Sequence, residues 1–279
     1  MAQWLVAAKR ADFQKMAEQY KIDPVIARLI RNRDVVGDEE IRKYLDGGVE
    51  DLYSPALLKD MDRAVEVLKD KIASGAKIRI IGDYDADGIC ASYVLLKGLS
   101  VCGARADTVI PHRVKDGYGL NESLLEDAAK DGIDTVVTCD NGIAAAAQIA
   151  YGRQLGLTVV VTDHHEIPYE EGEDGSRMYL LPEAAAVVDP KREDCGYPCK
   201  NICGAVVAYK LVQQLLEEYG KKEILEELLE IAAFATVCDL MELKDENRII
   251  VKCGLKNMRH TKNLGLKALM EVCGIEAEK

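Results

Sequence analysis

Residues 80–91 read IIGDYDADGICA, and three aspartates alternate along this stretch before Gly88. The same spacing opens an EF-hand calcium loop, but that loop also needs a bidentate carboxylate at its twelfth position. Counted from Asp83, this position is Val94, so the sequence argues against a calcium loop. The run KIRII before the aspartates is typical of a buried strand, and the run after them predicts a helix. The aspartates therefore lie on a strand-to-helix turn of an α/β unit.

The three acids of this turn, Asp83, Asp85 and Asp87, allow two interpretations. In the first, they form a solvated turn with a helix N-cap. In the second, they hold a cation, because carboxylates crowded at the carboxyl end of a strand repel one another and open α/β sheets place their sites at that edge. A bound cation is the simplest compensation for the repulsion.

From about residue 76 the chain alternates between short apolar runs and helical segments. Continuous apolar runs are expected of parallel strands that are covered on both faces. The pattern therefore predicts a doubly wound α/β fold with a mainly parallel sheet. The predicted strands are KIRIIGD, DTVIPHR, DTVVTCD, LTVVVTD and AAVVD. The acidic segment near 170–177 is predicted to be an exposed loop.

The same pattern divides the chain into three parts. Residues 1–75 are predicted to form a helical N-terminal leader, in which Asp23-Pro24 supplies a cap and a first-turn proline. Residues 76–245 are predicted to form the α/β domain. Residues 246–279 are predicted to form a helical connector.

The composition limits where the protein works. The chain has 279 residues, 48% of them hydrophobic, but no apolar run near the ~20 residues that a membrane helix needs. Its N-terminus does not resemble a secretion signal. Nine cysteines scattered through predicted strands and helices favour a reducing compartment, so we expect a cytoplasmic protein. Cys195, Cys199 and Cys203 are separated by three residues and lack a nearby fourth ligand, which favours a structural role over a zinc site.

The formal net charge of −12, taken alone, argues against a nucleic-acid partner. Cations bound at the carboxylate cluster would offset part of this charge. Residues 248–262 contain no acid and place Arg248, Lys252, Lys256 and Arg259 on or near one helical face. This face is interpreted either as the solvated side of a surface helix or as a surface that follows phosphates.

Four predicted strands end in an acid, in the segments IIGDYDAD, VVTCDNG, VVVTDHHE and AVVDP. Parallel strands direct their carboxyl ends to the same edge of a sheet, so these acids are expected to meet in one crevice. The third segment adds His164 and His165 to the carboxylates of Asp85, Asp87 and Asp140. Oxygen and imidazole ligands suit two hard divalent cations, manganese or magnesium.

The segments GDYDADG, TCDNG, TDHHE and TVCDLMEL resemble, in this order, the four motifs of the DHH phosphoesterase superfamily. Among its branches the chain is most similar to the exonucleases that act on single-stranded DNA. That closer resemblance rests on IPHRVKDGYGLN at 110–121, on DCGYPCKNICGAVVAYKL and on ENRIIV. It covers essentially the whole chain, including the leader, and implies that residues 76–245 are the catalytic domain.

The resemblance implies roles for individual residues. Five of them would ligate two manganese or magnesium ions: Asp85, Asp87, Asp140, His164 and Asp239.

The remaining roles concern catalysis and substrate binding. His165 would face the scissile phosphate, and Asp163 would orient a neighbouring histidine. Asp83 would be a further member of the catalytic group. Arg113 and Tyr118 would bind the substrate together with His165.

The chain departs from the superfamily pattern at two positions. Relatives often carry a histidine two positions before Asp83, where this chain has Ile81, which predicts weaker metal binding at one position. After the fifth strand the chain has Asp189-Pro190 in place of the usual Asn-Pro. From the sequence, Asp189 is interpreted only as a strand-ending cap.

The reaction implied by the resemblance is two-metal hydrolysis of phosphodiester bonds, in which the cations lower the pKa of the nucleophile. The implied function is a 5′-to-3′ exonuclease on single-stranded DNA in repair and recombination. One alternative is a DHH phosphodiesterase that acts on short oligoribonucleotides or cyclic dinucleotides, and the segment DGYGL argues against it. Another is a catalytically inactive partner protein, and the presence of all the acids and both histidines argues against that.

Family members normally continue into a second domain and an oligonucleotide-binding module. We therefore expect the chain to be the catalytic part of a longer protein. The expected partner is single-stranded nucleic acid, most simply DNA. The resemblance also admits partner proteins from replication or repair, and it implies no oligomeric state.

Overall fold

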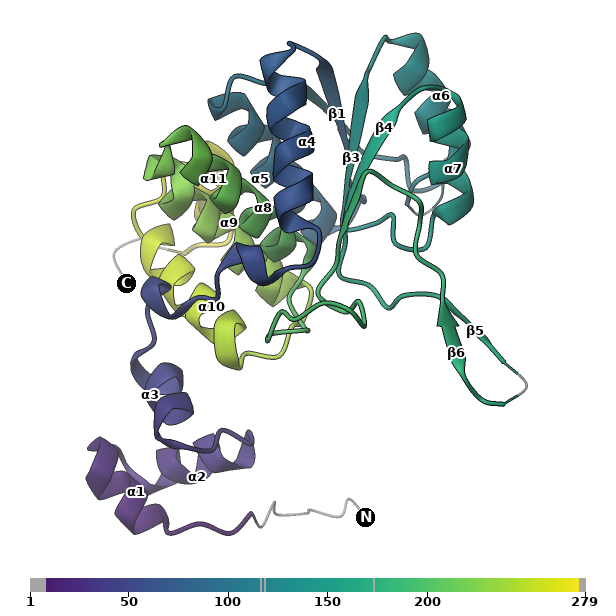
Figure 1. Cartoon of the computed structure of the whole chain (residues 1–279). Helices are drawn as coiled ribbons and strands as arrows, with labels where there is room; N and C mark the ends of the chain where they lie inside the picture. Colours follow the sequence, from purple (N-terminus) through teal and green to yellow (C-terminus); the bar gives the residue numbers. More distant parts are fainter. Residues whose placement is uncertain (1–8, 116, 118, 173, 276–279) are drawn as a thin grey trace.

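The computed structural model describes residues 9–115, 117, 119–172 and 174–275. Its centre is a sheet of five strands in the order β2-β1-β3-β4-β7 (Figure 1). Each neighbouring pair of strands in this sheet is parallel, which confirms the predicted mainly parallel sheet. The strands are β1 (Lys77–Ile81), β2 (Arg105–Val109), β3 (Thr135–Cys139), β4 (Thr158–Thr162) and β7 (Ala186–Val188).

Helices cover both faces of the sheet (Figure 1). One face packs against α4 (Met61–Ala73), α5 (Ala86–Val101) and α8 (Gly204–Tyr219), and the other against α6 (Glu122–Lys130) and α7 (Ala146–Gln154). Alternate residues of the central strands belong to the two hydrophobic cores, which explains why these strands are apolar at nearly every position. The doubly wound fold predicted from the sequence is confirmed.

The strand order reverses between β1 and β3. From β1 the chain first adds β2 on one side, and it then returns to add β3 on the other side. In open α/β sheets, ligands bind beyond the carboxyl ends of the strands at such a switch point. The aspartates after β1 and Asp140 after β3 both follow strands that flank it. The topology therefore brings two distant sequence motifs to one place.

The chain after β7 is mostly helical. α9 (Leu225–Cys238) packs against α5, α8 and α10 (Asp245–Met258), so these helices form a second body beside the sheet (Figure 1). The elements after α8 are η3 (Lys222–Ile224), α9 (Leu225–Cys238), α10 (Asp245–Met258) and α11 (Leu264–Val272).

The acidic segment near 170–177 lies in an antiparallel hairpin of β5 (Tyr169–Glu171) and β6 (Arg177–Tyr179). All six residues of these strands are exposed, and the hairpin projects from the body of the molecule (Figure 1). The predicted exposure is correct, but the prediction missed the two strands. A hairpin with no buried face has no alternation of apolar and polar residues to reveal it.

The leader begins with three helices, α1 (Phe13–Tyr20), α2 (Pro24–Asn32) and α3 (Asp38–Asp46). They share a small hydrophobic core of their own. The predicted cap is present, because Asp23 accepts a hydrogen bond from the Val25 amide at 2.7 Å. The two 3₁₀ turns η1 (Val49–Asp51) and η2 (Pro55–Leu57) lead to α4, which contributes to the main core.

Two basic residues of α10 bind the leader. Arg248 Nε donates to the Tyr44 carbonyl at 2.6 Å, and its guanidinium lies 3.8 Å from the centre of the Tyr44 ring. Lys252 Nζ donates to the carbonyls of Leu45 at 3.1 Å and Gly47 at 3.3 Å. These two side chains stabilise the C-terminal end of α3, a role that neither interpretation of the basic face included.

The three clustered cysteines are buried free thiols. Cys195 Sγ accepts from the Lys59 amide at 3.4 Å, and Cys203 Sγ lies 3.7 Å from Thr236 Oγ1. The structural role of the cluster stays a prediction.

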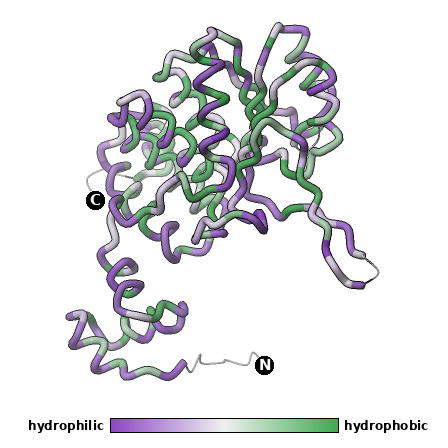
Figure 2. The backbone as a smooth tube through the Cα atoms, viewed as in Figure 1, coloured by the Kyte–Doolittle hydropathy of each residue, from purple (hydrophilic) through white to green (hydrophobic). Residues whose placement is uncertain are grey.

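Hydrophobic residues concentrate in the sheet and the helices around it, whereas hydrophilic residues prevail in the leader (Figure 2). Across the described residues, no helix has the length and apolarity needed to cross a membrane.

Candidate metal centre

The turn between β1 and α5 carries the first three acids. Asp85 is the N-cap of α5, and its Oδ1 accepts a hydrogen bond from the Gly88 amide at 2.9 Å. Gly88 is needed there because a Cβ would lie 2.6 Å from the backbone of Asp83. The interpretation as a helix cap therefore holds for Asp85. Asp83 and Asp87, in contrast, are buried and are not part of a solvated turn.

Asp87, in the first turn of α5, accepts hydrogen bonds from the first turn of α8. Its Oδ2 accepts from the Gly204 amide at 2.6 Å, and its Oδ1 accepts from the Ala205 amide at 2.8 Å. These are orphan donors of a helix that has Cys203 at its N-cap and no side-chain cap from its own sequence. A buried carboxylate is favoured at this position by the helix dipole.

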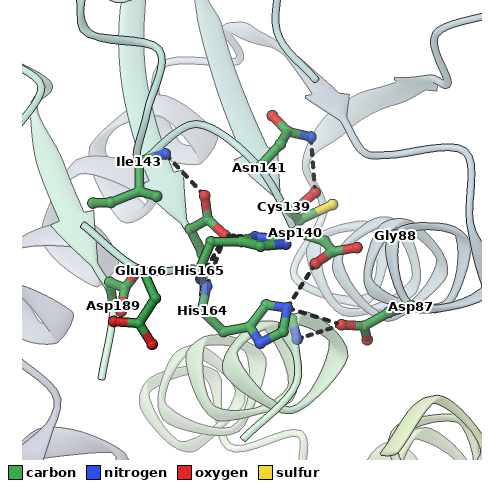
Figure 3. A network of polar contacts seen from close by, with 12 residues as sticks. Asp87, Gly88, Cys139, Asp140, Asn141, Ile143, His164, His165, Glu166 and Asp189 are labelled. Carbon is green, nitrogen blue, oxygen red and sulfur yellow. Dashed lines mark hydrogen bonds and ion pairs between the residues drawn. The ribbon is translucent and has the colours of Figure 1, made fainter. Parts of the chain in front are cut away.

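His164 lies at the centre of the cluster. Its Nε2 is 3.0 Å from Asp140 Oδ1, 3.6 Å from Asp87 Oδ2 and 3.9 Å from Asp239 Oδ2. Figure 3 shows the imidazole between the carboxylates that follow β3 and begin α5. One ring nitrogen therefore faces carboxylates from three separate elements, which is the arrangement expected of ligands around a cation.

Asp163 is fully enclosed by hydrogen bonds. Its Oδ1 lies 2.7 Å from His165 Nδ1 and also accepts from the His164 amide at 2.7 Å, while its Oδ2 accepts from the Ile143 amide at 2.8 Å (Figure 3). Burial is the largest single influence on the pKa of Asp163 and would raise it. The hydrogen bond and charge of His165, together with the amides of Ile143 and His164, outweigh burial, and the pKa is lowered. The same hydrogen bond raises the pKa of His165 above its usual value. The pair favours a charged imidazolium that the carboxylate orients.

Three acids of the site, Asp140, Asp83 and Asp239, have raised pKa values instead. Burial, followed by the charges of Asp87 and Asp85, raises the pKa of Asp140 to about 10. Burial likewise raises the pKa of Asp83 and of Asp239. Both oxygens of Asp83, and Oδ2 of Asp239, receive no hydrogen bond of good geometry from any described residue. Buried carboxylates without donors are costly, and a cation would remove that cost.

These side chains form three groups, and within each group the potential ligand atoms lie within 4.8 Å of one another. One group shares Asp140 with a second and His164 with the third, so the cluster is continuous. Its oxygen and imidazole donors suit Mn²⁺ or Mg²⁺. All five predicted metal ligands and the three predicted catalytic residues occur in or beside it. The groups are Asp140, His164 and His165; Asp87, His164 and Asp239; and Asp83, Asp85 and Asp140.

Arg113 lies at the edge of this cluster. It follows β2 on an exposed turn, and its guanidinium carbon is 4.7 Å from the centre of the Tyr84 ring. Tyr84 lies between Asp83 and Asp85 in the sequence. Tyr118, the other residue predicted to bind substrate, lies outside the described residues. A cavity of about 310 Å³ adjoins His165 and is lined by residues from the neighbouring 119–120 and 141–148 segments.

The two departures from the superfamily pattern have different surroundings. Ile81 is fully buried in the core beneath α6 and α7. Asp189 is also fully buried; its Oδ1 accepts from the Lys191 amide at 2.7 Å, and burial raises its pKa to about 7. No helix begins after Asp189 in the described chain before α8, so this hydrogen bond stabilises a turn rather than a helix N-terminus. The other oxygen of Asp189 receives no hydrogen bond from a described residue.

Sequence reasoning missed three residues that shape the site. Asn141 Nδ2 donates to the carbonyls of Ile81 at 3.2 Å and Cys139 at 3.0 Å, and so ties the ends of β1 and β3 together. Gly204 and Ala205 supply the amides that bind Asp87. The available sequence signal was Gly204 at the start of a predicted helix without a polar N-cap residue, which leaves the first amides of that helix open to another acceptor.

The comparisons with known proteins agree with this geometry. A family model described as DHH family, N-terminal domain, matches residues 77–236. The single-stranded-DNA-specific exonuclease RecJ of Bacillus subtilis is 39% identical over 94% of this chain and 31% of its own length. The protein of the same name from Escherichia coli is 32% identical over 93% of this chain and 44% of its own length. The chain thus spans about a third to under a half of these curated relatives.

Solved structures give the same picture. An exonuclease RecJ bound to manganese superimposes with a TM-score of 0.70 at 30% identity, covering 81% of this chain and 55% of that one. RecJ from Thermus thermophilus in complex with Mn²⁺ gives a TM-score of 0.75 at 27% identity, covering 95% of this chain and 36% of that one. With its four motifs gathered at the switch point of the sheet, the chain belongs to the DHH family, whose N-terminal domain it contains.

Proposed function

We propose that this chain is the catalytic part of a metal-dependent exonuclease that hydrolyses single-stranded DNA from 5′ to 3′ in repair and recombination. The observation that carries the proposal is the convergence of carboxylates and imidazoles from four motifs into one cluster, in which Asp83, Asp87, Asp140 and His164 are buried. Relatives that match over nearly the whole chain are named as single-stranded-DNA-specific exonucleases. Solved relatives are bound to manganese or magnesium.

Two Mn²⁺ or Mg²⁺ ions would be held by five residues: Asp85, Asp87, Asp140, His164 and Asp239. When bound, such ions polarise a phosphoryl oxygen and lower the pKa of a water molecule to near neutrality. Asp83 is close enough to Asp85 and Asp140 to share in this charge balance.

The protein's own side chains position the substrate. His165, held by Asp163 and favoured in its charged form, donates to the scissile phosphate, where negative charge increases during the reaction. Arg113 offers a forked pair of donors to a neighbouring phosphate, and the Tyr84 ring limits its orientation. Tyr118 is proposed as a further substrate contact. The cavity beside His165 is of the size that small ligands occupy, which suits one nucleotide unit.

The test is digestion, by the full-length protein, of single-stranded oligonucleotides labelled at either end, with Mn²⁺ and with a chelator. We expect metal-dependent release of mononucleotides, starting at the 5′ end. Cyclic dinucleotides and short oligoribonucleotides serve as competing substrates, and faster hydrolysis of these would contradict the proposal. Metal binding without hydrolysis of any of these substrates would favour the catalytically inactive alternative.

The cytoplasm is the proposed location, because all nine cysteines of the chain are free thiols. Labelling of the thiols in intact cells, compared with labelling after lysis, tests this: fully reduced cysteines are expected. Disulfides would contradict it.

A further inference from the structure

Two segments that are far apart in the sequence complete the metal centre from the helical body. The first is 199–204, which ends in the Gly204 amide that binds Asp87. The second is 239–244, which begins with Asp239. Neither segment is part of a helix or strand over most of its length, so other contacts must fix the distance between them.

The first turn of α10 makes those contacts. Asn247, which is 2% exposed, donates through Nδ2 to the Asn201 carbonyl at 2.6 Å and to the Glu242 carbonyl at 3.2 Å. A single amide group therefore bridges the two segments. Asn201 lies three residues before Gly204, and Glu242 lies three residues after Asp239.

The neighbouring Glu246 anchors this turn in the core. Its carboxylate accepts hydrogen bonds from Lys210 Nζ at 2.7 Å, from the Tyr53 amide at 2.8 Å and from the Tyr197 hydroxyl. Lys210 also donates to the Tyr53 carbonyl at 2.7 Å, and both charged side chains are fully buried. Removing one partner of a buried ion pair is strongly destabilising. Any movement of the first turn of α10 away from α8 and the leader would separate Glu246 from Lys210 and Tyr53, so this turn has one well-defined position.

The segment after Asp239 needs external support. Leu240 has φ = 55° and Asp245 has φ = 46°, and neither is a glycine. Backbone in this region is unfavourable for a bulky residue such as leucine, and it persists only where the surroundings determine it. The contacts of Glu246 and Asn247 are placed where this segment joins α10.

We infer that Asn247 and Glu246 are positioning residues that set the distance between Asp239 and the Asp87 side of the metal centre. The inference rests on the proposed function, because it assigns these residues a role in metal binding. Neither residue is proposed to touch metal or substrate. Supporting residues of this kind change metal affinity by moving the ligands rather than by adding one.

The experiment compares Asn247→Ala with Asn257→Ala. Asn257 is a matched control because it is on the same helix, and its Nδ2 donates only to the exposed Glu226 carbonyl at 3.4 Å among described contacts. Calorimetric titration with Mn²⁺ should show about tenfold weaker binding for Asn247→Ala and wild-type affinity for Asn257→Ala. Equal affinity of the two variants would overturn the inference.

Hydrogen exchange without metal provides a second, independent measurement. Amides in 199–204 and 239–244 should exchange several-fold faster in Asn247→Ala than in Asn257→Ala, and unchanged exchange would contradict the inference. If the wild-type chain binds no Mn²⁺, the proposed function fails, while this measurement still decides whether Asn247 holds the two segments.

A gentler variant covers the case in which Asn247→Ala does not fold. Tyr197→Phe keeps the buried ring and removes only the hydroxyl that donates to Glu246. It should speed exchange in 199–204 and weaken Mn²⁺ binding. The transition temperature should fall only moderately, because Glu246 keeps its hydrogen bonds from Lys210 and the Tyr53 amide. Wild-type exchange and wild-type affinity in Tyr197→Phe would overturn the role of Glu246.

Discussion

Asp140 shows how a single residue is adapted to its site at some cost to the fold. Its φ of 59° is in the left-handed region, where Asn and Asp are the non-glycine residues most often found. The side chain is buried, and burial with neighbouring acids raises its pKa to about 10. Without a cation, therefore, Asp140 favours a neutral carboxyl group.

Asn is the informative replacement at this position. Asp140→Asn keeps the backbone preference and the shape but removes the charge, so the transition temperature of the metal-free protein should hold or rise. Mn²⁺ affinity should fall by at least the ~10-fold that is typical when a supporting group of a metal site is lost. Calorimetry and thermal melts measure the two effects. Asp34→Asn is the control, because Asp34 is exposed and has a similar φ of 62°. Unchanged Mn²⁺ affinity in Asp140→Asn would exclude the assigned site.

Arg113 and His165 should separate substrate binding from catalysis. Arg113→Ala should weaken binding of single strands and flatten its salt dependence, because one fewer phosphate contact releases fewer counterions. His165→Ala should bind nearly normally but cleave ~10²–10³-fold more slowly, as when one stabilising donor is removed. The measurements are single-turnover cleavage and binding titrations at several salt concentrations with the same oligonucleotide.

Arg177 is the matched control for this pair of variants. Its guanidinium lies 4.4 Å from the centre of the Tyr169 ring on the β5–β6 hairpin, in an arrangement like that of Arg113 over Tyr84. Arg177→Ala should leave both binding and cleavage unchanged. The roles of Arg113 and His165 would be wrongly assigned if Arg113→Ala bound single strands normally and His165→Ala failed to bind them.

Among the elements that carry no predicted ligand, α8 directly contacts the metal centre. It starts at Gly204, directly against the site, and Asp87 accepts hydrogen bonds from its first two amides. A Cβ at Gly204 would lie 2.7 Å from Asp140 Cβ. The start of the helix and the end of β3 can approach this closely only because Gly204 has no side chain.

The added methyl group of Gly204→Ala should therefore displace two proposed metal ligands, Asp140 by direct contact and Asp87 through its hydrogen bond to the residue 204 amide. Overpacking of this kind typically destabilises by about 1–3 kcal/mol, and Mn²⁺ affinity should fall because Asp140 and Asp87 must move apart. Gly196→Ala is the control, since a Cβ there meets no atom within 4 Å. Thermal melts and Mn²⁺ titrations of both variants test the prediction, and equal behaviour of the two would show that the close approach at Gly204 is not required.

For the whole molecule, the buried acids make stability depend on pH. The pKa of Asp140 is raised from 3.8 to about 10, and that of Asp189 to about 7, in both cases mainly by burial. Between pH 3.8 and the raised pKa of each acid, the folded state binds more protons than the unfolded chain. The free energy of unfolding therefore falls as the pH rises through this range. His165 acts in the same direction, because the stability from its raised pKa is present below its unfolded value and lost at higher pH.

We expect the transition temperature of the metal-free protein to fall from about pH 5 to pH 9. Saturating Mn²⁺ should flatten or reverse this trend, because the cation binds the deprotonated carboxylates and displaces their protons. Thermal melts across this range, with and without Mn²⁺, measure both curves. Asp140→Asn should give a flatter metal-free curve than the wild type, and a metal-free protein whose stability rises steadily with pH would contradict the assignment of these acids.

The sequence by itself determined the α/β architecture and most of the chemistry of the site. Continuous apolar runs specify strands buried on both faces, and the acids after them are predicted at one edge because parallel strands share a direction. These are local patterns, so they can be read without knowing what packs where. The same reasoning located the acids and histidines that follow the strands, whereas Asp239, which follows α9, came only from the resemblance to the DHH superfamily.

Only the tertiary structure decided the contacts between distant segments. The amides of Gly204 and Ala205 meet Asp87 across more than a hundred residues, and Asn247 bridges two loops through their carbonyls. Backbone donors and acceptors are the same in every residue. A sequence pattern can therefore indicate a helix start such as Gly204, but it does not reveal which distant side chain will bind the amides there. Packing of α8 against the sheet, and of α10 against α9, selects these partners and with them the geometry of the metal centre.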